Sequence, residues 1–99
     1  MRRFIGIIFK SLDEGFVATF PDVLECIEFG ETAEEAGALA AATLPALLRD
    51  LELGIGRPIR ASTLEEIIGD PQNEGCQAFE AVTLVFNPGR SAHLNAAAA

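Results

Sequence analysis

Positive charge is scarce in this sequence. Its 99 residues contain 7 Lys and Arg against 15 Asp and Glu, which gives a formal net charge of −8. Nucleic acids are polyanions, and proteins bind their backbones tightly by replacing counterions with Lys and Arg side chains. We therefore expect no direct nucleic-acid binding by this chain. A basic protein is the partner that its charge favours.

Cysteine and histidine are also scarce. Cys26 and Cys76 form no CxxC pair, and His93 is the only histidine. A metal site needs several such ligands close together, so we expect no metal and no cofactor. We interpret the two cysteines as free thiols in a reducing cytoplasm, although the sequence alone leaves a disulfide open.

Long hydrophobic runs are missing as well. No segment approaches the roughly 20 apolar residues that span a bilayer, so we expect no membrane association. The start of the chain resembles a signal peptide only faintly, because the apolar run of residues 4–9 is short and Lys10 and Asp13 follow it. We expect a cytoplasmic protein. With 49% hydrophobic residues, the chain has enough apolar surface to fold as one domain.

Four segments carry strand patterns. Residues 4–9 are apolar on both faces, as in a buried central strand. Residues 16–20 and 26–29 follow after short links, which favours an antiparallel meander. Residues 79–86 are rich in aromatic and β-branched side chains and form the clearest strand pattern of the chain.

Two helices are predicted between the third and fourth strands. Thr32 followed by Glu35 is a capping-box pattern that begins the first, and a second capping signal over residues 62–66 begins a short helix that ends near Gly69. Pro45 removes a helical hydrogen bond, so we expect a kink or a break there. Apolar side chains recur at helical spacing in the first helix and form one stripe: Ala36, Leu39, Ala40, Leu44, Leu47, Leu48 and Leu51.

The order βββ-α-(short α)-β predicts an α+β fold, with an antiparallel sheet and the long helix packed on one face through Leu39, Leu44, Leu47 and Leu51. Residues 4–9 should be an interior strand. Sheet edges must be covered, so we also expect a homodimer or a higher homo-oligomer that uses an edge strand or the sheet face.

Several short motifs, taken in order, resemble the HicB-like antitoxin family. The stretches GFVATFPDV at 15–23 and GETAEEA at 30–36 are similar to the family signature, and STLEEI at 62–67 looks like the segment before the last strand of many relatives. The resemblance covers residues 1–88. Glu25 departs from it, because the family usually has glycine before the third strand, and so does Pro45 within the helix.

This resemblance implies a partly degraded RNase H-like fold and a bacterial antitoxin that binds and masks a small basic HicA-like mRNA-cleaving toxin. Many relatives also carry a C-terminal DNA-binding module, whereas only eleven residues follow Pro88 here. We therefore expect a single-domain form, with residues 1–88 as the HicB-like α+β domain and residues 89–99 as a flexible tail. A solitary protein-interaction module without a toxin partner is the alternative.

Acidic residues are concentrated in one stretch. Eight of them, and no Lys or Arg, lie between Lys10 and Arg49. Charge alone favours a solvated surface that keeps the domain soluble, while the resemblance favours a docking face for a basic toxin. On that basis we predict partner-binding roles for four acids of this stretch: Asp22, Glu25, Glu28 and Glu31.

An enzyme is the competing class, in particular a metal-dependent nuclease of the RNase H type. Such an enzyme needs several carboxylates around metal ions, usually with one in the first strand, and residues 4–9 contain none. Asp22 and Glu25 could bind a cation, yet Pro-Asp is commonly only a turn. His93 has no nearby nucleophile, and Cys26 lies among acids that raise a thiol pKa. We expect no catalytic residues and no enzyme.

Overall fold

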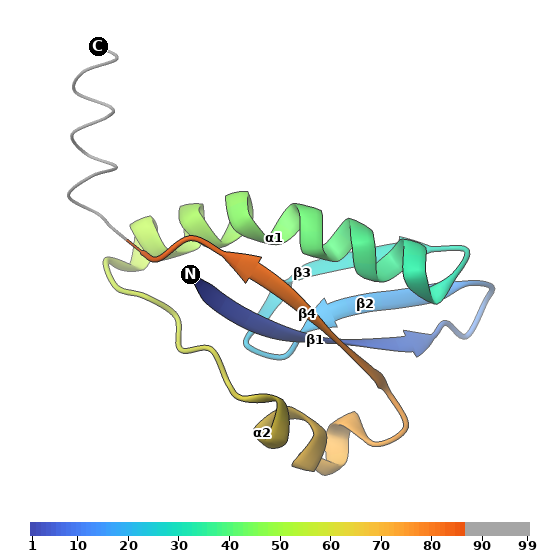
Figure 1. The fold of residues 1–99 in the computed structure, drawn as a ribbon. Helices are drawn as coiled ribbons and strands as arrows, with labels where there is room; N and C mark the ends of the chain where they lie inside the picture. The colour runs from blue at the N-terminus through green and yellow to red at the C-terminus, as the bar shows by residue number, and fades with distance from the viewer. Residues whose placement is uncertain (87–99) are drawn as a thin grey trace.

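The computed structural model describes residues 1–86, and the expected tail of residues 89–99 lies outside them. A four-stranded sheet carries one long helix on one face and one short helix on the other (Figure 1). No helix in the described part of the chain has the length and apolarity to cross a bilayer. The elements are β1 (Arg2–Lys10), β2 (Phe16–Phe20), β3 (Val23–Gly30), α1 (Ala33–Ile55), α2 (Leu64–Gly69), the 3-10 helix η1 (Pro71–Asn73) and β4 (Gln77–Thr83).

The strands pair in the order β3-β2-β1-β4, and every pairing is antiparallel. The predicted meander and the interior position of residues 4–9 are confirmed. The predicted fourth strand is partly wrong, because β4 ends at Thr83 and not at Phe86. Thr83 pairs with Arg2, which is the first residue of β1, so the chain beyond it has no neighbouring strand to bond.

The helix α1 begins where the capping pattern predicts. The Thr32 hydroxyl accepts a hydrogen bond from the Glu35 amide (3.1 Å), and Gly56 ends the helix in the left-handed region at φ 86°. Of the kink or break expected at Pro45, the break is wrong, since α1 continues from Ala33 to Ile55, and the kink stays a prediction. Pro45 is exposed, so its missing hydrogen bond falls on the solvent side while the opposite side holds the helix to the sheet.

The predicted apolar stripe of α1 is confirmed except at Leu39, which is 41% exposed. Leu47 and Leu51 are half-buried, and the other members of the stripe are buried: Ala36, Ala40, Leu44 and Leu48. The helix lies too close to the sheet for large side chains at its start: a Cβ at Gly30 would come within 2.6 Å of the Ala36 nitrogen. Small side chains therefore fill the first turns, and the buried residues are Ala36, Gly37, Ala40, Leu44, Leu48 and Glu52.

Two apolar clusters lie on the two faces of the sheet. The larger one joins α1 to the sheet, with Phe4 and Phe20 fully buried. The Phe20 and Phe79 rings meet at 5.1 Å between centroids, above Gly6, where a Cβ would collide with the Phe79 ring. The smaller cluster joins Ile5 and Ile7 of β1 to Ile67 of α2, so α2 covers only the β1–β4 half of its face.

A charged side chain ends the buried face of α1. Glu52 is 1% exposed and accepts hydrogen bonds from Arg2 Nη1 (2.6 Å), Arg2 Nη2 (2.7 Å) and the Ile59 amide (2.6 Å). Arg2 Nη2 also donates to the Leu84 carbonyl (3.1 Å). Burial raises the pKa of Glu52, but the hydrogen bonds and charge of Arg2 and the Ile59 amide outweigh it, so the pKa is lowered. Arg2 thus joins β1 to α1 through Glu52 and to the segment after β4 through Leu84.

Candidate functional site

The four predicted partner-binding acids lie along one edge of the sheet. Asp22 is half-buried in the turn between β2 and β3, and Glu31 is exposed directly after β3. Glu25 and Glu28 belong to β3 itself, which is an edge strand. The topology therefore brings them to a common strand and its two ends, which the sequence stretch alone did not guarantee.

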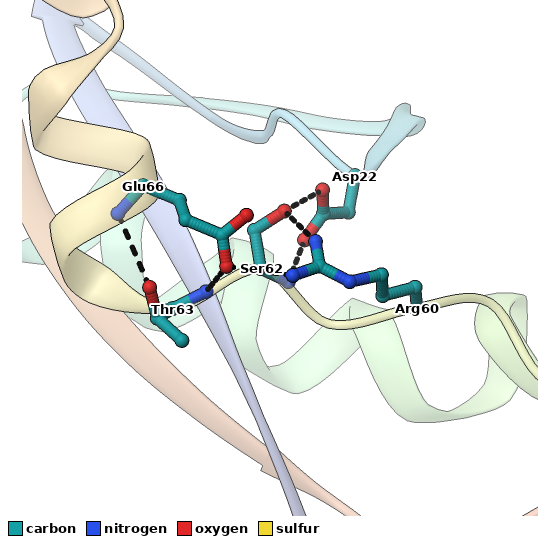
Figure 2. A network of polar contacts seen from close by, with 5 residues as sticks. All are labelled: Asp22, Arg60, Ser62, Thr63 and Glu66. Carbon is teal, nitrogen blue, oxygen red and sulfur yellow. Dashed lines mark hydrogen bonds and ion pairs between the residues drawn. The ribbon is translucent and has the colours of Figure 1, made fainter.

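Asp22 is occupied by a contact within the protein. Its carboxylate accepts hydrogen bonds from the Ser62 amide (2.6 Å) and the Ser62 hydroxyl (2.8 Å), as Figure 2 shows. These bonds fasten the β2–β3 turn to the segment that precedes α2. The sequence gives no sign of this role, because the capping signal of residues 62–66 fits either Ser62 or Thr63 as the cap of α2. Thr63 is the cap, and Ser62 is left to bind Asp22.

The Asp22 contact continues into an exposed network (Figure 2). Arg60 donates to the Ser62 hydroxyl (3.3 Å) and to the Glu66 carboxylate (2.7 Å), which also accepts from the Thr63 amide (3.1 Å). The hydrogen bond from Arg60, followed by the one from the Thr63 amide, lowers the pKa of Glu66 to about 2. Arg60 is thus already paired with Glu66, and the network positions α2.

Glu25 lies in an irregular part of β3. The pairing shifts from Thr19 with Ile27 to Phe20 with Val23, so residues 24–26 have no partner in the β2–β3 register. The Thr19 hydroxyl donates to the Cys26 carbonyl there (2.7 Å). No non-glycine residue among those described has a positive φ, so the strand accommodates Glu25 where the family usually has glycine. The bulge leaves the Glu25 side chain exposed.

Glu28 lies on the α1 side of β3. Its carboxylate accepts a hydrogen bond from the Thr43 hydroxyl of α1 (3.1 Å), and its side chain is half-buried. Glu28 is therefore held in one place, whereas Glu25 and Glu31 are exposed and their carboxylates accept no hydrogen bond from the described residues. Any partner of this edge would meet one fixed carboxylate and two adaptable ones.

The opposite face of the same strands is apolar. The register aligns Phe29 with Val17 and Val17 with Phe9, so these three side chains form a row across β3, β2 and β1. Ile27 lies beside them on β3. We call Phe9, Val17, Ile27 and Phe29 the Phe9–Phe29 patch. Phe9 is 39%, Ile27 47% and Phe29 63% exposed, while Val17 is buried at its floor.

The described residues do not assemble a catalytic site. No group of three His, Cys, Asp or Glu side chains in residues 1–86 is arranged to hold a metal ion. Both cysteines are free. Burial, followed by the charge of Glu28, raises the pKa of the Cys26 thiol, which disfavours a reactive thiolate. An open hollow of about 420 Å³ lies beside α2 and η1, but its side chains form no triad or ligand set.

Comparisons with known proteins give a structural likeness alone. No family model matches the sequence, and no curated protein matches it significantly. Among solved structures, the N-terminal domain of the Burkholderia pseudomallei antitoxin HicB superposes with a TM-score of 0.70 at 19% identity, covering 85% of this chain and 100% of that one. A chain of a HicA3 and HicB3 toxin-antitoxin complex gives 0.61 at 24% identity, with the same coverage.

The full Burkholderia pseudomallei antitoxin HicB gives a TM-score of 0.69 at 19% identity and covers 99% of this chain and 84% of that one. At these identities the likeness shows the fold. The protein has the fold of the HicB N-terminal domain, which agrees with the α+β fold that the order of the elements predicted.

Proposed function

We propose that this protein is a HicB-like antitoxin that binds and masks a small basic HicA-like mRNA-cleaving toxin in the bacterial cytoplasm. The observation that carries the proposal is the superposition on the complete N-terminal domain of an antitoxin HicB. The order of the motifs in the sequence supports the same conclusion. The protein acts by occupying a surface and carries out no catalysis.

Charge supports the choice of partner. A toxin that cleaves mRNA must bind phosphates through basic side chains, and a carboxylate-rich surface can occupy those side chains in place of RNA. Glu25, Glu28 and Glu31 are the proposed contacts along the β3 edge. Asp22 belongs to the set as the turn residue directly before β3, where its bonds to Ser62 hold the turn in place.

The test begins with the basic protein encoded beside this gene. The two proteins are co-expressed and co-purified, and mRNA cleavage by the neighbour is measured with and without this chain. The proposal expects a stable complex and suppression of cleavage. A neighbour that cleaves mRNA but forms no complex, or a neighbourhood without any basic toxin, would leave the solitary interaction module as the better description.

Charge variants test the β3 edge. Glu25→Lys, Glu28→Gln and Glu31→Lys together change the net charge from −8 to −3, and glutamine at 28 keeps an acceptor for Thr43. A matched control with the same net charge changes three exposed acids elsewhere: Asp50→Asn, Glu65→Lys and Glu74→Lys. The edge variant should associate with the toxin at least about tenfold more slowly than this control at low salt. Equal rates would show that the edge acids are only a solvated surface.

Self-association through β4 is the second part of the proposal. β4 is the other edge of the sheet, and its one acid, Glu80, lies 3.7 Å from the Arg3 guanidinium. The edge is also apolar: Val82 of β4 is 45% exposed, and Leu84 and Val85, which follow the strand, are 73% and 63% exposed. Antiparallel pairing of two β4 strands would cover this edge with little charge repulsion. Sedimentation should show a dimer that Val82→Lys dissociates, and a wild-type monomer at micromolar concentration would refute it.

A further inference from the structure

The Phe9–Phe29 patch remains uncovered on a face that α2 protects elsewhere. Ile67 of α2 packs on Ile5 and Ile7, while Phe9, Ile27 and Phe29 receive no such cover from residues 1–86 and stay 39% to 63% exposed. Soluble domains rarely expose two large aromatic side chains on one row of a sheet. Contiguous apolar surface of this kind commonly marks a site where a partner binds.

The border of the patch is mainly acidic: three exposed acids lie at one end of it, against one exposed cation, Lys10, which directly follows Phe9. The turn after β1 contains Asp13 and Glu14, and it folds back against the end of β3, since a Cβ at Gly15 would meet the Gly30 carbonyl oxygen. This contact brings Glu31 to the same end of the patch. All three acids are exposed, and none forms an ion pair within residues 1–86. The patch is thus an apolar centre with an acidic rim.

Its size means that the rim must take part in any stable contact. Three partly exposed side chains present on the order of 300 Å² of apolar surface, whereas a standard interface buries about 800 Å² on each partner. A partner that covers the patch must therefore cover the surrounding acids too. The sign of those acids then selects the partner.

A second copy of this chain is the wrong occupant. A twofold interface places the same surface on both partners, so two patches in contact would bring two net negative rims, each with Asp13, Glu14 and Glu31, into one interface. Like charges brought together at an interface oppose association. A basic protein has no such penalty.

We propose that the Phe9–Phe29 patch is the apolar anchor of a docking surface for a basic protein, which sets an apolar side chain on Phe9, Ile27 and Phe29 and directs Lys or Arg to the acidic rim. This inference rests on the proposed function, because the basic toxin is the partner. It adds that a large part of the binding free energy comes from the sheet face opposite α1, and that charge alone does not hold the complex.

The experiment compares Ile27→Ala/Phe29→Ala with a control, Ile55→Ala/Ile68→Ala, whose isoleucines are 51% and 59% exposed elsewhere on the protein. The probe is the purified basic protein encoded beside this gene, and the dissociation constant is measured by calorimetry at low and at physiological salt. The patch variant should bind roughly 10- to 30-fold more weakly at both salt concentrations, as loss of an aromatic anchor does, while the control should bind as wild type does.

Each outcome decides between the proposals. If wild type binds and the patch variant binds with the same dissociation constant, the patch is not the anchor, and the proposed function still stands. Absence of wild-type binding to a neighbour that cleaves mRNA overturns both. A wild-type dimer that the patch variant converts to a monomer would assign the patch to self-association and overturn the anchor. Phe29→Ala alone repeats the measurement if the double variant unfolds, because Phe29 is 63% exposed and its loss removes little core packing.

Discussion

Removing the Glu52 carboxylate should destabilise the protein more than its position near the end of a helix suggests. Glu52 is 1% exposed and accepts three hydrogen bonds, two from Arg2 and one from the Ile59 amide. The Arg2 side chain is only 18% exposed, so it cannot regain full hydration when its partner is lost. Breaking such a pair from one side leaves a buried charge and an unsatisfied amide.

The expected size follows from these contacts. One-sided loss of a buried pair costs about 3–5 kcal/mol, and partial exposure of Arg2 places the cost of Glu52→Ala at about 3 kcal/mol. Glu52→Gln retains one acceptor and should cost about 2 kcal/mol. A small domain has a free energy of unfolding of only about 5–15 kcal/mol, so either loss is easily measured.

Urea unfolding followed by circular dichroism is the assay, with Glu65→Gln as the exposed control, expected to change the free energy of unfolding by less than about 0.5 kcal/mol. A double-mutant cycle with Arg2→Met should give a coupling energy of roughly 1–3 kcal/mol. If Glu52→Gln unfolds at the same urea concentration as the control, the ion pair contributes nothing and the reasoning is refuted.

The same contact predicts a pH dependence. The pKa of Glu52 is lower in the folded protein than its ordinary value of 4.5, so the folded state favours the ionised form. Its contribution is therefore complete well above the unfolded pKa and is lost as pH falls through the folded pKa. Wild type should lose more stability than Glu52→Gln when the pH falls from 6 to about 3. Parallel curves for the two proteins would contradict the assignment.

Three further predictions follow from packing and contacts. Leu48→Ala should cost about 2–5 kcal/mol in urea unfolding, against less than about 1 kcal/mol for the exposed Leu39→Ala; a reversed order would mean that α1 is rotated. Asp22→Ala should lower the free energy of unfolding by about 1–2 kcal/mol and increase amide exchange in α2, since it releases the two hydrogen bonds from Ser62. Unchanged exchange would show that Asp22 does not stabilise α2. Under native conditions, Cys76 should react with a thiol reagent well before the buried Cys26, whose pKa is raised. Equal reaction rates would contradict the burial of Cys26 in the core.

Local patterns anticipated the elements well. The capping pair Thr32 and Glu35 marked the start of α1, and the two-sided apolar run of residues 4–9 marked β1 as the interior strand. Both patterns are reliable because each reflects a physical need of a single element. The first amides of a helix need hydrogen-bond acceptors, and a strand covered on both faces needs apolar residues on both. The boundary at residue 88 and the flexible tail remain predictions.

Local sequence patterns could not predict the contacts between elements that are distant in the chain. Leu39 satisfies the helical spacing of the core stripe, yet α1 lies so close to the sheet at Gly30 that only the small members of the stripe, Ala36 and Ala40, are buried in its first turns. Leu39 is left 41% exposed. Glu52 has the residue type of a solvated helix position, and only the arrival of Arg2, fifty residues earlier in the chain, makes its burial stable.

The sequence by itself determined the class of fold, the order of its elements and the acidity of the stretch from Asp13 to Glu35, because propensity, capping and charge are properties of neighbouring residues. The tertiary structure decided which acids are free and which are not: Asp22 is held by Ser62 and Glu28 by Thr43, while Glu25 and Glu31 stay exposed. It also decided that Phe9, Val17 and Phe29 form one row, since strand register joins residues up to twenty positions apart. A surface for a partner is made of such long-range neighbours, and no local pattern records them.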